Sequence, residues 1–179
     1  MATINKKLFS HLNVEDNDPV WEKFVEVEFP KKNIFPDHKA YLLEDGLVRK
    51  YYLHNTSDID TEICAEFYFP GDIFTVGKGS EGIYESINEG LTWEITLDEV
   101  KNLFAVNPHC RFVQNYYLSR KLNAAMKREM LLLKNTPQDL YEYLLKHKPH
   151  YIQNIPLKYL ASYIGITPIS LSRIRKRIL

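Results

Sequence analysis

The sequence predicts an α+β protein: an N-terminal antiparallel β-roll of the double-stranded jelly-roll type with flanking helices, one long helix, and a C-terminal all-α region containing a helix-turn-helix. Three observations predict this order. Short segments of alternating polar and apolar residues recur about every ten residues between positions 24 and 96, as in β-sandwiches and barrels. Residues 109–133 contain neither Gly nor Pro and have apolar residues at helical spacing. The segment 155–179 has the pattern of two short helices joined by a tight turn.

The elements of the roll follow in order. Asp18 can cap a short helix that begins at Pro19. In the segment 46–53, period-two alternation places Arg49 and Tyr51 on one strand face and Lys50 on the other. Clusters of Gly, Asn, Asp and Ser separate the expected strands and favour turns. The strands are expected in FVEVEF (24–29), GLVRKYYL (46–53), EICAEFYF (62–69), DIFTV (72–76), GIYESI (82–87) and TWEIT (92–96).

Helices are expected after the roll. Thr96 and Glu99 fit a capping box, which predicts a short helix over residues 98–105. The long helix over 108–133 would extend about 40 Å, more than one small β-domain needs. Its apolar stripe either packs on the chain's own domain or faces a second copy, and periodicity leaves both open. A further amphipathic helix is expected over 138–147. The stripe consists of Asn115, Leu118, Leu122, Met126, Met130 and Leu133.

The composition is that of a globular protein. The chain has 179 residues, of which 45% are hydrophobic and 26% charged. No apolar run approaches the roughly 18 residues that cross a bilayer, and the start lacks the features of a signal peptide. We therefore expect a cytoplasmic protein with no membrane partner. Cys64 and Cys110 are too few for a disulfide framework or a four-thiolate metal site, so we expect both to be reduced and buried.

A net charge of zero conceals opposite charges in the two halves of the chain. Residues 1–110 carry 10 Lys and Arg against 20 Asp and Glu, a net charge of −10. Residues 111–179 carry 13 Lys and Arg against 3 Asp and Glu, a net charge of +10. A basic part attached to an acidic part indicates that the C-terminal half faces a polyanion.

The segment 155–179 meets the demands of a helix-turn-helix. Two helices that cross steeply through a tight turn need a small residue in the first helix and glycine at the turn, and Ala161 and Gly165 supply them. Thr167 and Pro168 suit the cap and first position of the second helix. The residues expected to form the small core are Leu160, Ile164, Ile166, Leu171 and Ile174.

The outward face of this second helix fits double-stranded DNA. Such a helix enters the major groove, where an arginine can bind the O6 and N7 atoms of guanine, and Arg173 is our candidate for that role. Ser170, Ser172 and the helix N-terminus are candidates for phosphate contacts. Arg175, Lys176 and Arg177 also suit a solvated last turn that complements the helix dipole. The candidate DNA-binding residues are Thr167, Ile169, Ser170, Ser172, Arg173, Lys176 and Arg177.

The order of elements, the segment PLKYLASYIGITPISLSRIRKRIL and the phrases EDGLVRKYY and FYFPGDIF resemble the Crp/Fnr family of bacterial transcription regulators. The resemblance implies an effector domain like a cyclic-nucleotide-binding domain over 1–106, a dimerisation helix over 107–134 and a DNA-binding domain over 135–179. It also implies a homodimer joined along the long helix, bound to a palindromic operator, with RNA polymerase as a further candidate partner. Pro168 and Ile169 replace a charged pair of the family, which leaves the operator sequence open.

The effector site departs from the family pattern. Gly71 and Asp72 match the turn of the phosphate cassette, but Thr75 and Val76 replace its Gly-Glu pair. Ile83 and Tyr84 fall where the family has Arg-Ser or Arg-Thr. A buried phosphate would meet no paired cation here, so we expect no cyclic nucleotide in the usual mode. No cofactor is predicted and the effector is unknown; the haem-ligand candidates His38, His54 and His109 are better explained as ordinary histidines.

The sequence leaves three classes of function to distinguish. The leading hypothesis is a dimeric, sequence-specific DNA-binding regulator with a degenerate effector pocket. The alternative is a ligand-sensing or partner-binding β-roll module whose helix-turn-helix no longer reads DNA. An enzyme is the weakest hypothesis, because paired carboxylates such as Glu26 and Glu28 fall on solvated strand faces, and no catalytic triad, His-x-His cluster or Gly-rich nucleotide motif accompanies them.

Overall fold

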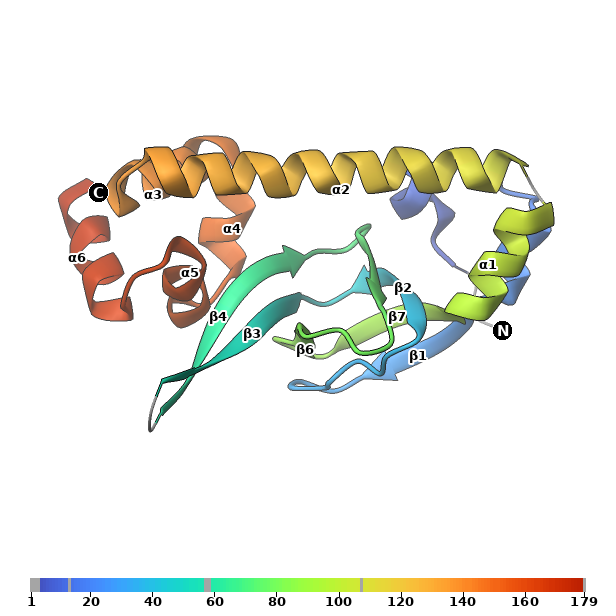
Figure 1. Cartoon of the computed structure of the whole chain (residues 1–179), viewed down its shortest axis with the longest axis horizontal. Helices are drawn as coiled ribbons and strands as arrows, with labels where there is room; N and C mark the ends of the chain where they lie inside the picture. Colours follow the sequence, from blue (N-terminus) through green and yellow to red (C-terminus); the bar gives the residue numbers. More distant parts are fainter. Residues whose placement is uncertain (1–3, 13, 57–58, 107, 179) are drawn as a thin grey trace. The chain divides into compact units, whose positions relative to one another are not determined.

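The computed structural model describes residues 4–12, 14–56, 59–106 and 108–178, of which 55–56, 59–60, 106 and 108–113 are described by their backbone alone. The chain divides into two compact units (Figure 1). The first comprises Met1–Tyr51 and Glu66–Tyr117, and the second comprises Tyr52–Ala65 and Leu118–Leu179. Each unit is therefore assembled from two separate stretches of the chain.

The strands form two sheets, as expected for the predicted β-roll. One sheet has the order β1-β7-β2-β5 and the other β4-β3-β6, and the pairs β1–β7, β2–β7, β2–β5 and β3–β6 are antiparallel. In the β3–β6 pair, Arg49 lies opposite Glu85 and Lys50 opposite Tyr84. The strands are β1 (Val25–Phe29), β2 (Lys39–Asp45), β3 (Val48–Thr56), β4 (Ile59–Tyr68), β5 (Ile73–Val76), β6 (Ile83–Ser86) and β7 (Gly90–Thr96).

Strand β2 was not anticipated from the sequence. Its central residues Ala40, Tyr41, Leu42 and Leu43 are all buried, so the strand lacks the alternation that marks a half-solvated strand. Tyr41 and Leu43 face the core between the sheets, whereas Leu42 packs with the N-terminal segment on the other side. Because both faces of β2 are buried, its sequence shows no alternation of polar and apolar residues.

The core of the roll is aromatic. Tyr41 and Phe74 stack with ring centroids 4.8 Å apart, and Phe74 and Tyr84 stack at 5.5 Å. Tyr68 lies 5.0 Å from Phe74 and 5.9 Å from Tyr84, centroid to centroid. These rings come from both sheets, and they fill the space between them.

A second cluster covers the outer side of the four-stranded sheet. Ile4, Phe9 and Trp21 from the N-terminal segment pack with Leu42 and Trp93. The short 3-10 helices η1 (Lys6–Leu12) and η2 (Pro19–Lys23) carry two of these residues. The backbone N–H of Val20 donates to the Asp18 carboxylate at 2.9 Å, as expected for the predicted cap.

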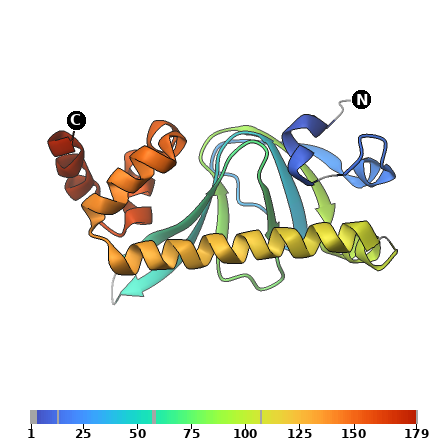
Figure 2. The ribbon, with the colours of Figure 1, turned by 90° about the horizontal axis from the view of Figure 1, so that it is seen from above.

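The remaining helices are α1 (Leu97–Val106), α2 (Pro108–Lys134), α3 (Pro137–His147), α4 (Pro149–Asn154), α5 (Leu157–Ile164) and α6 (Pro168–Ile178). The capping box before α1 is confirmed, because the Glu99 amide donates to Thr96 Oγ1 at 3.3 Å while the Thr96 amide donates to the Glu99 carboxylate at 3.2 Å. Figures 1 and 2 show α2 as one uninterrupted helix. Short helix α4 lies in a segment where the sequence analysis placed no element.

The expectation for the cysteines is met in part. Cys64 has no exposed surface, as expected, whereas the Cys110 side chain lies outside the described residues. Across the part of the chain that the structure describes, no helix combines the length and apolar character needed to cross a membrane.

Candidate nucleic-acid interface

The turn between α5 and α6 depends on glycine. Gly165 ends α5 with a φ of +86°, a left-handed conformation that side chains with a Cβ rarely adopt. Its amide donates to the carbonyl oxygens of Ala161 at 3.0 Å and Ser162 at 3.1 Å, and the Ile166 amide also donates to Ala161 O. These bonds satisfy the carbonyls of Ala161 and Ser162 and end α5 at Gly165.

The start of α6 is capped as the sequence predicts. The Ser170 amide donates to Thr167 Oγ1 at 3.2 Å, and the Leu171 amide donates to the Thr167 carbonyl at 3.0 Å. Pro168 occupies the first helical position, where the missing N–H costs nothing. The first turn of α6 is therefore held in a fixed geometry.

A small core joins α5 to α6. Leu160, Ala161 and Ile164 from α5 and Leu171 and Ile174 from α6 are each at most 6% exposed. Ala161 has no exposed surface, so a larger side chain there would separate the two helices. Ile166, the remaining predicted core residue, is half-buried. The structure thus forms the predicted helix-turn-helix core.

The opposite face of α6 is exposed and basic. Ile169 is 67% exposed, and Arg173, Lys176 and Arg177 are also exposed, while Arg175 is half-buried. Thr167 is exposed, and Ser170 and Ser172 are half-buried. The sequence of α6 contains no acidic residue. A helix with this face can enter the major groove, contact base edges through its first turns and neutralise phosphates with its basic residues.

The apolar stripe on α2 is also exposed. The exposed fractions are 54% for Leu118, 62% for Leu122, 55% for Met126, 53% for Met130 and 78% for Leu133. Asn115 is exposed as well. Large apolar side chains gathered on one helix face are rare on a monomer and mark interaction surfaces.

The predicted effector residues do not all face the interior of the roll. Val76 and Tyr84 are buried in the aromatic core, whereas Thr75 is exposed, because successive β5 residues point to opposite faces. Ile83 is half-buried and points to the face opposite Tyr84. Of the four predicted residues on β5 and β6, Val76 and Tyr84 therefore lie in the core and Thr75 and Ile83 do not.

Gly71 and Asp72 form the tight turn before β5. Gly71 has a φ of +91°, which favours glycine. The Asp72 carboxylate accepts a hydrogen bond from the Phe69 amide at 2.8 Å, and the Asp72 amide donates to the Phe69 carbonyl, also at 2.8 Å. The carboxylate therefore stabilises its own turn.

Several polar groups of the roll were not predicted from the sequence. The Lys50 ammonium lies 5.4 Å from the centre of the Tyr84 ring, which also stacks on Phe74. The Tyr68 hydroxyl donates to the Glu66 carboxylate at 2.6 Å; burial and this carboxylate raise the pKa of Tyr68 far above its ordinary value. Period-two alternation places Lys50 on the strand face opposite to that of Arg49, which is consistent with its inward orientation. Nothing in the sequence indicated which aromatic rings Lys50 would contact.

Arg49 and Glu85 form a buried ion pair on the other face of β3 and β6. Arg49 is 2% exposed and Glu85 is 8% exposed, and the Arg49 Nε donates to Glu85 Oε2 at 3.1 Å. The Arg49 guanidinium also lies 4.1 Å from the centre of the Tyr51 ring. Mutual pairing and the aromatic contact compensate for the loss of water around these charges.

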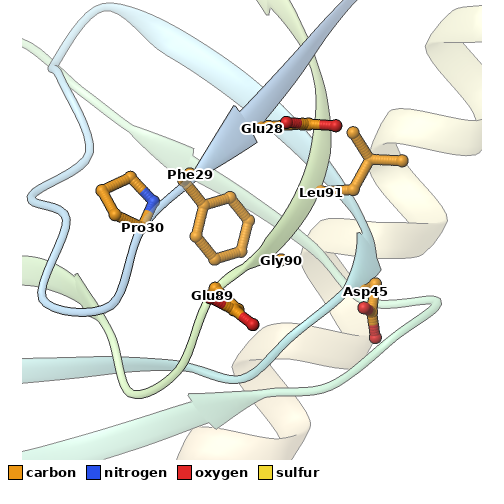
Figure 3. Close-up of a pocket in the computed structure, with 7 residues that line it drawn as sticks. All are labelled: Glu28, Phe29, Pro30, Asp45, Glu89, Gly90 and Leu91. Carbon is orange, nitrogen blue, oxygen red and sulfur yellow. The ribbon is translucent and has the colours of Figure 1, made fainter.

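A separate acidic cavity lies near the ends of β1, β2 and β7 (Figure 3). It has a volume of about 530 Å³, and Glu28, Asp45 and Glu89 line it beside Phe29 and Leu91. None of the predicted site residues lines this cavity. Among the residues that the structure describes, no group of three or more His, Cys, Asp or Glu side chains could hold a metal ion.

Solved structures share this arrangement of roll, long helix and helix-turn-helix. FixK2 from Bradyrhizobium japonicum matches with a TM-score of 0.75 and 18% sequence identity over 87% of this chain and 84% of FixK2. The c-di-GMP-responsive global regulator CLP from Xanthomonas campestris matches with a TM-score of 0.67 and 16% identity, over 88% of this chain and 87% of CLP. A protein from Eubacterium rectale described as a transcriptional regulator of the Crp/Fnr family matches with a TM-score of 0.67 and 18% identity, over 99% of this chain and 83% of that one.

These likenesses define the fold. The chain has the fold of Crp/Fnr-type regulators, as its sequence resemblance predicted. No protein-family model matches the chain, and no curated protein matches it in sequence. With sequence identities of 16–18%, the function has to be argued from the chain's own residues.

Proposed function

We propose that the protein is a sequence-specific DNA-binding transcription regulator of the Crp/Fnr type. It acts as a homodimer joined along the long helix, with residues 1–106 as effector domain, 107–134 as dimerisation helix and 135–179 as DNA-binding domain. The observation that carries the proposal is the exposed, acid-free face of α6, which is held against α5 by a buried core.

Specific roles follow for residues on α6. Arg173 is exposed on the central turn and reads guanine, since its guanidinium can donate to both O6 and N7. Ile169, exposed on the first turn, contacts the apolar methyl group of thymine. Lys176 and Arg177 contact phosphates, and Thr167 and Ser170 add contacts at the helix N-terminus.

The exposed stripe on α2 supports the homodimer. Two copies that align these helices would bury Leu118, Leu122, Met126, Met130 and Leu133, which recur every three or four residues on one helix face, against each other. A two-fold dimer places two copies of α6 on a two-fold symmetric operator, and half-sites of helix-turn-helix dimers lie about 34 Å apart. A palindromic target is therefore expected.

The interior of the roll supports a degenerate effector pocket. The two positions of the cassette that face the core, Val76 and Tyr84, carry no charge that could hold a phosphate. The rings of Tyr68, Phe74 and Tyr84 pack directly against one another. We propose that cyclic nucleotides do not bind here in the mode usual for the family.

Selection from a library of random DNA duplexes tests the proposed function. The full-length protein should enrich a palindromic sequence, and its affinity should fall with salt at a slope near −5 in log–log terms if about six phosphates are neutralised. Arg173→Glu should abolish enrichment, whereas Lys78→Glu, the same charge change on an exposed turn of the roll, should not. Enrichment of no sequence would favour the alternative that the helix-turn-helix serves only for packing.

A further inference from the structure

The open edge of β4 is closed by a side chain from α5. Among the described strands, the sheet order β4-β3-β6 places β4 at an edge. On its other side, the Cys64 amide donates to Ser162 Oγ at 2.9 Å, and Ser162 Oγ donates to the Glu62 carbonyl at 2.8 Å. One hydroxyl thus accepts from residue 64 and donates to residue 62, which is the pattern a residue of a neighbouring parallel strand would make.

Arg128 of α2 joins the same contact. Its Nη2 donates to the Cys64 carbonyl at 3.4 Å and to the Tyr163 carbonyl at 3.2 Å. The guanidinium also lies 4.6 Å from the centre of the Tyr163 ring. The Nε atom of Arg128 is buried and has no hydrogen-bond partner within the described residues, so the group is inserted between the elements rather than lying on the surface. A single side chain of α2 therefore contacts both β4 and α5.

We propose that Ser162 and Arg128 are positioning residues that fix the helix-turn-helix against β4, and that this contact sets the affinity for DNA. This inference rests on the proposed function. Ser162 lies on α5, which shares a buried core with α6, so a restraint on α5 is transmitted to the DNA-facing helix. The contact leaves Ile169 and Arg173 exposed, which makes it compatible with DNA binding rather than inhibitory.

Strand β4 connects this contact to the core of the roll. The same strand runs from Ile59 to Tyr68, and it carries Cys64 at the contact and Tyr68 in the aromatic cluster. Three residues separate these two positions along the strand.

DNA binding by the full-length protein tests the inference. Ser162→Ala removes both hydroxyl bonds while alanine favours the helix, so α5 itself is not weakened. To bind an operator with two half-sites, a dimer must hold its two copies of α6 at a fixed separation and orientation. Binding to a single half-site needs only one copy of α6. We expect Ser162→Ala and Arg128→Met to lower affinity for the full operator about tenfold and affinity for a half-site less than twofold. Ser162→Thr, which keeps the hydroxyl, should restore affinity.

Amide hydrogen exchange provides a readout without DNA. The Cys64 amide should exchange at least tenfold faster in Ser162→Ala than in the wild type or Ser162→Thr, because its acceptor is removed. Suppose that the wild type binds a selected operator. The positioning role is then overturned, and the proposed function is not, if the Cys64 amide of Ser162→Ala exchanges at the wild-type rate. The same holds if Ser162→Ala loses equal affinity for the operator and for the half-site. If the wild type selects no operator, the proposed function is overturned and the coupling with it.

Discussion

Substituting Leu122 tests whether α2 forms the dimer interface. Leu122 is 62% exposed and lies in the middle of the apolar stripe. Fully burying a leucine contributes about 1.5–3 kcal/mol, so covering the exposed part contributes about 1–2 kcal/mol. A two-fold dimer contains the residue twice, which brings the expected loss in Leu122→Gln to about 2–4 kcal/mol. This corresponds to a dimer dissociation constant about 30-fold to several hundred-fold higher.

Sedimentation equilibrium over a range of protein concentrations measures this change directly. The matched control is Ala124→Gln, which adds a glutamine to an exposed position about half a helical turn away from the stripe and should leave the dimer intact. Two results would rule out α2 as the dimer interface. The wild type could sediment as a monomer at tens of micromolar, or Leu122→Gln could dimerise as tightly as the control.

The other predictions concern DNA contacts, a helix cap and the core. Arg173→Ala should weaken binding to a selected operator by about 1–3 kcal/mol and reduce discrimination at one base pair. Lys176→Ala should weaken binding to all duplexes alike and lower the slope of log affinity against log salt by about one unit. Fluorescence anisotropy measures both effects. Hydrogen bonds from Thr136 hold the pKa of Asp139 below its ordinary value of 3.8, so the cap of α3 contributes stability above that pH and loses it as the pH falls through the lower folded-state pKa. Urea titrations at several pH values should show that Asp139→Ala destabilises the protein near neutral pH and that the difference from wild type shrinks below about pH 4. Tyr84→Ala should lower the free energy of unfolding by about 3–5 kcal/mol in the same assay, because the side chain is 6% exposed and stacked between rings.

Local signals account for the parts of the fold that the sequence predicted. Thr96 with Glu99, and Thr167 with Pro168, are short-range patterns whose hydrogen bonds form within one turn of helix. Gly165 is predictable for the same reason, because its left-handed conformation depends on its own backbone. By contrast, β2 was missed because burial on both faces gives no alternation, and the identity of the rings that fill the roll depends on contacts between strands.

The candidate DNA-binding face could be predicted because helical periodicity assigns each α6 residue to a side. Once Leu171 and Ile174 are buried, Arg173 has to lie outward. The effector residues were less predictable, since Thr75 proved to be exposed while its neighbour Val76 is buried. The contact between Ser162 and Cys64 joins positions far apart in the chain, so no local sequence pattern predicts it.

Amide chemical-shift mapping with the selected duplex shows whether α6 carries the DNA-reading face. We expect the largest shift changes at residues 167–177, with smaller ones at the N-terminus of α5 and none in the core of the roll. Shift changes confined to the roll, or none anywhere at saturating duplex, would contradict the account.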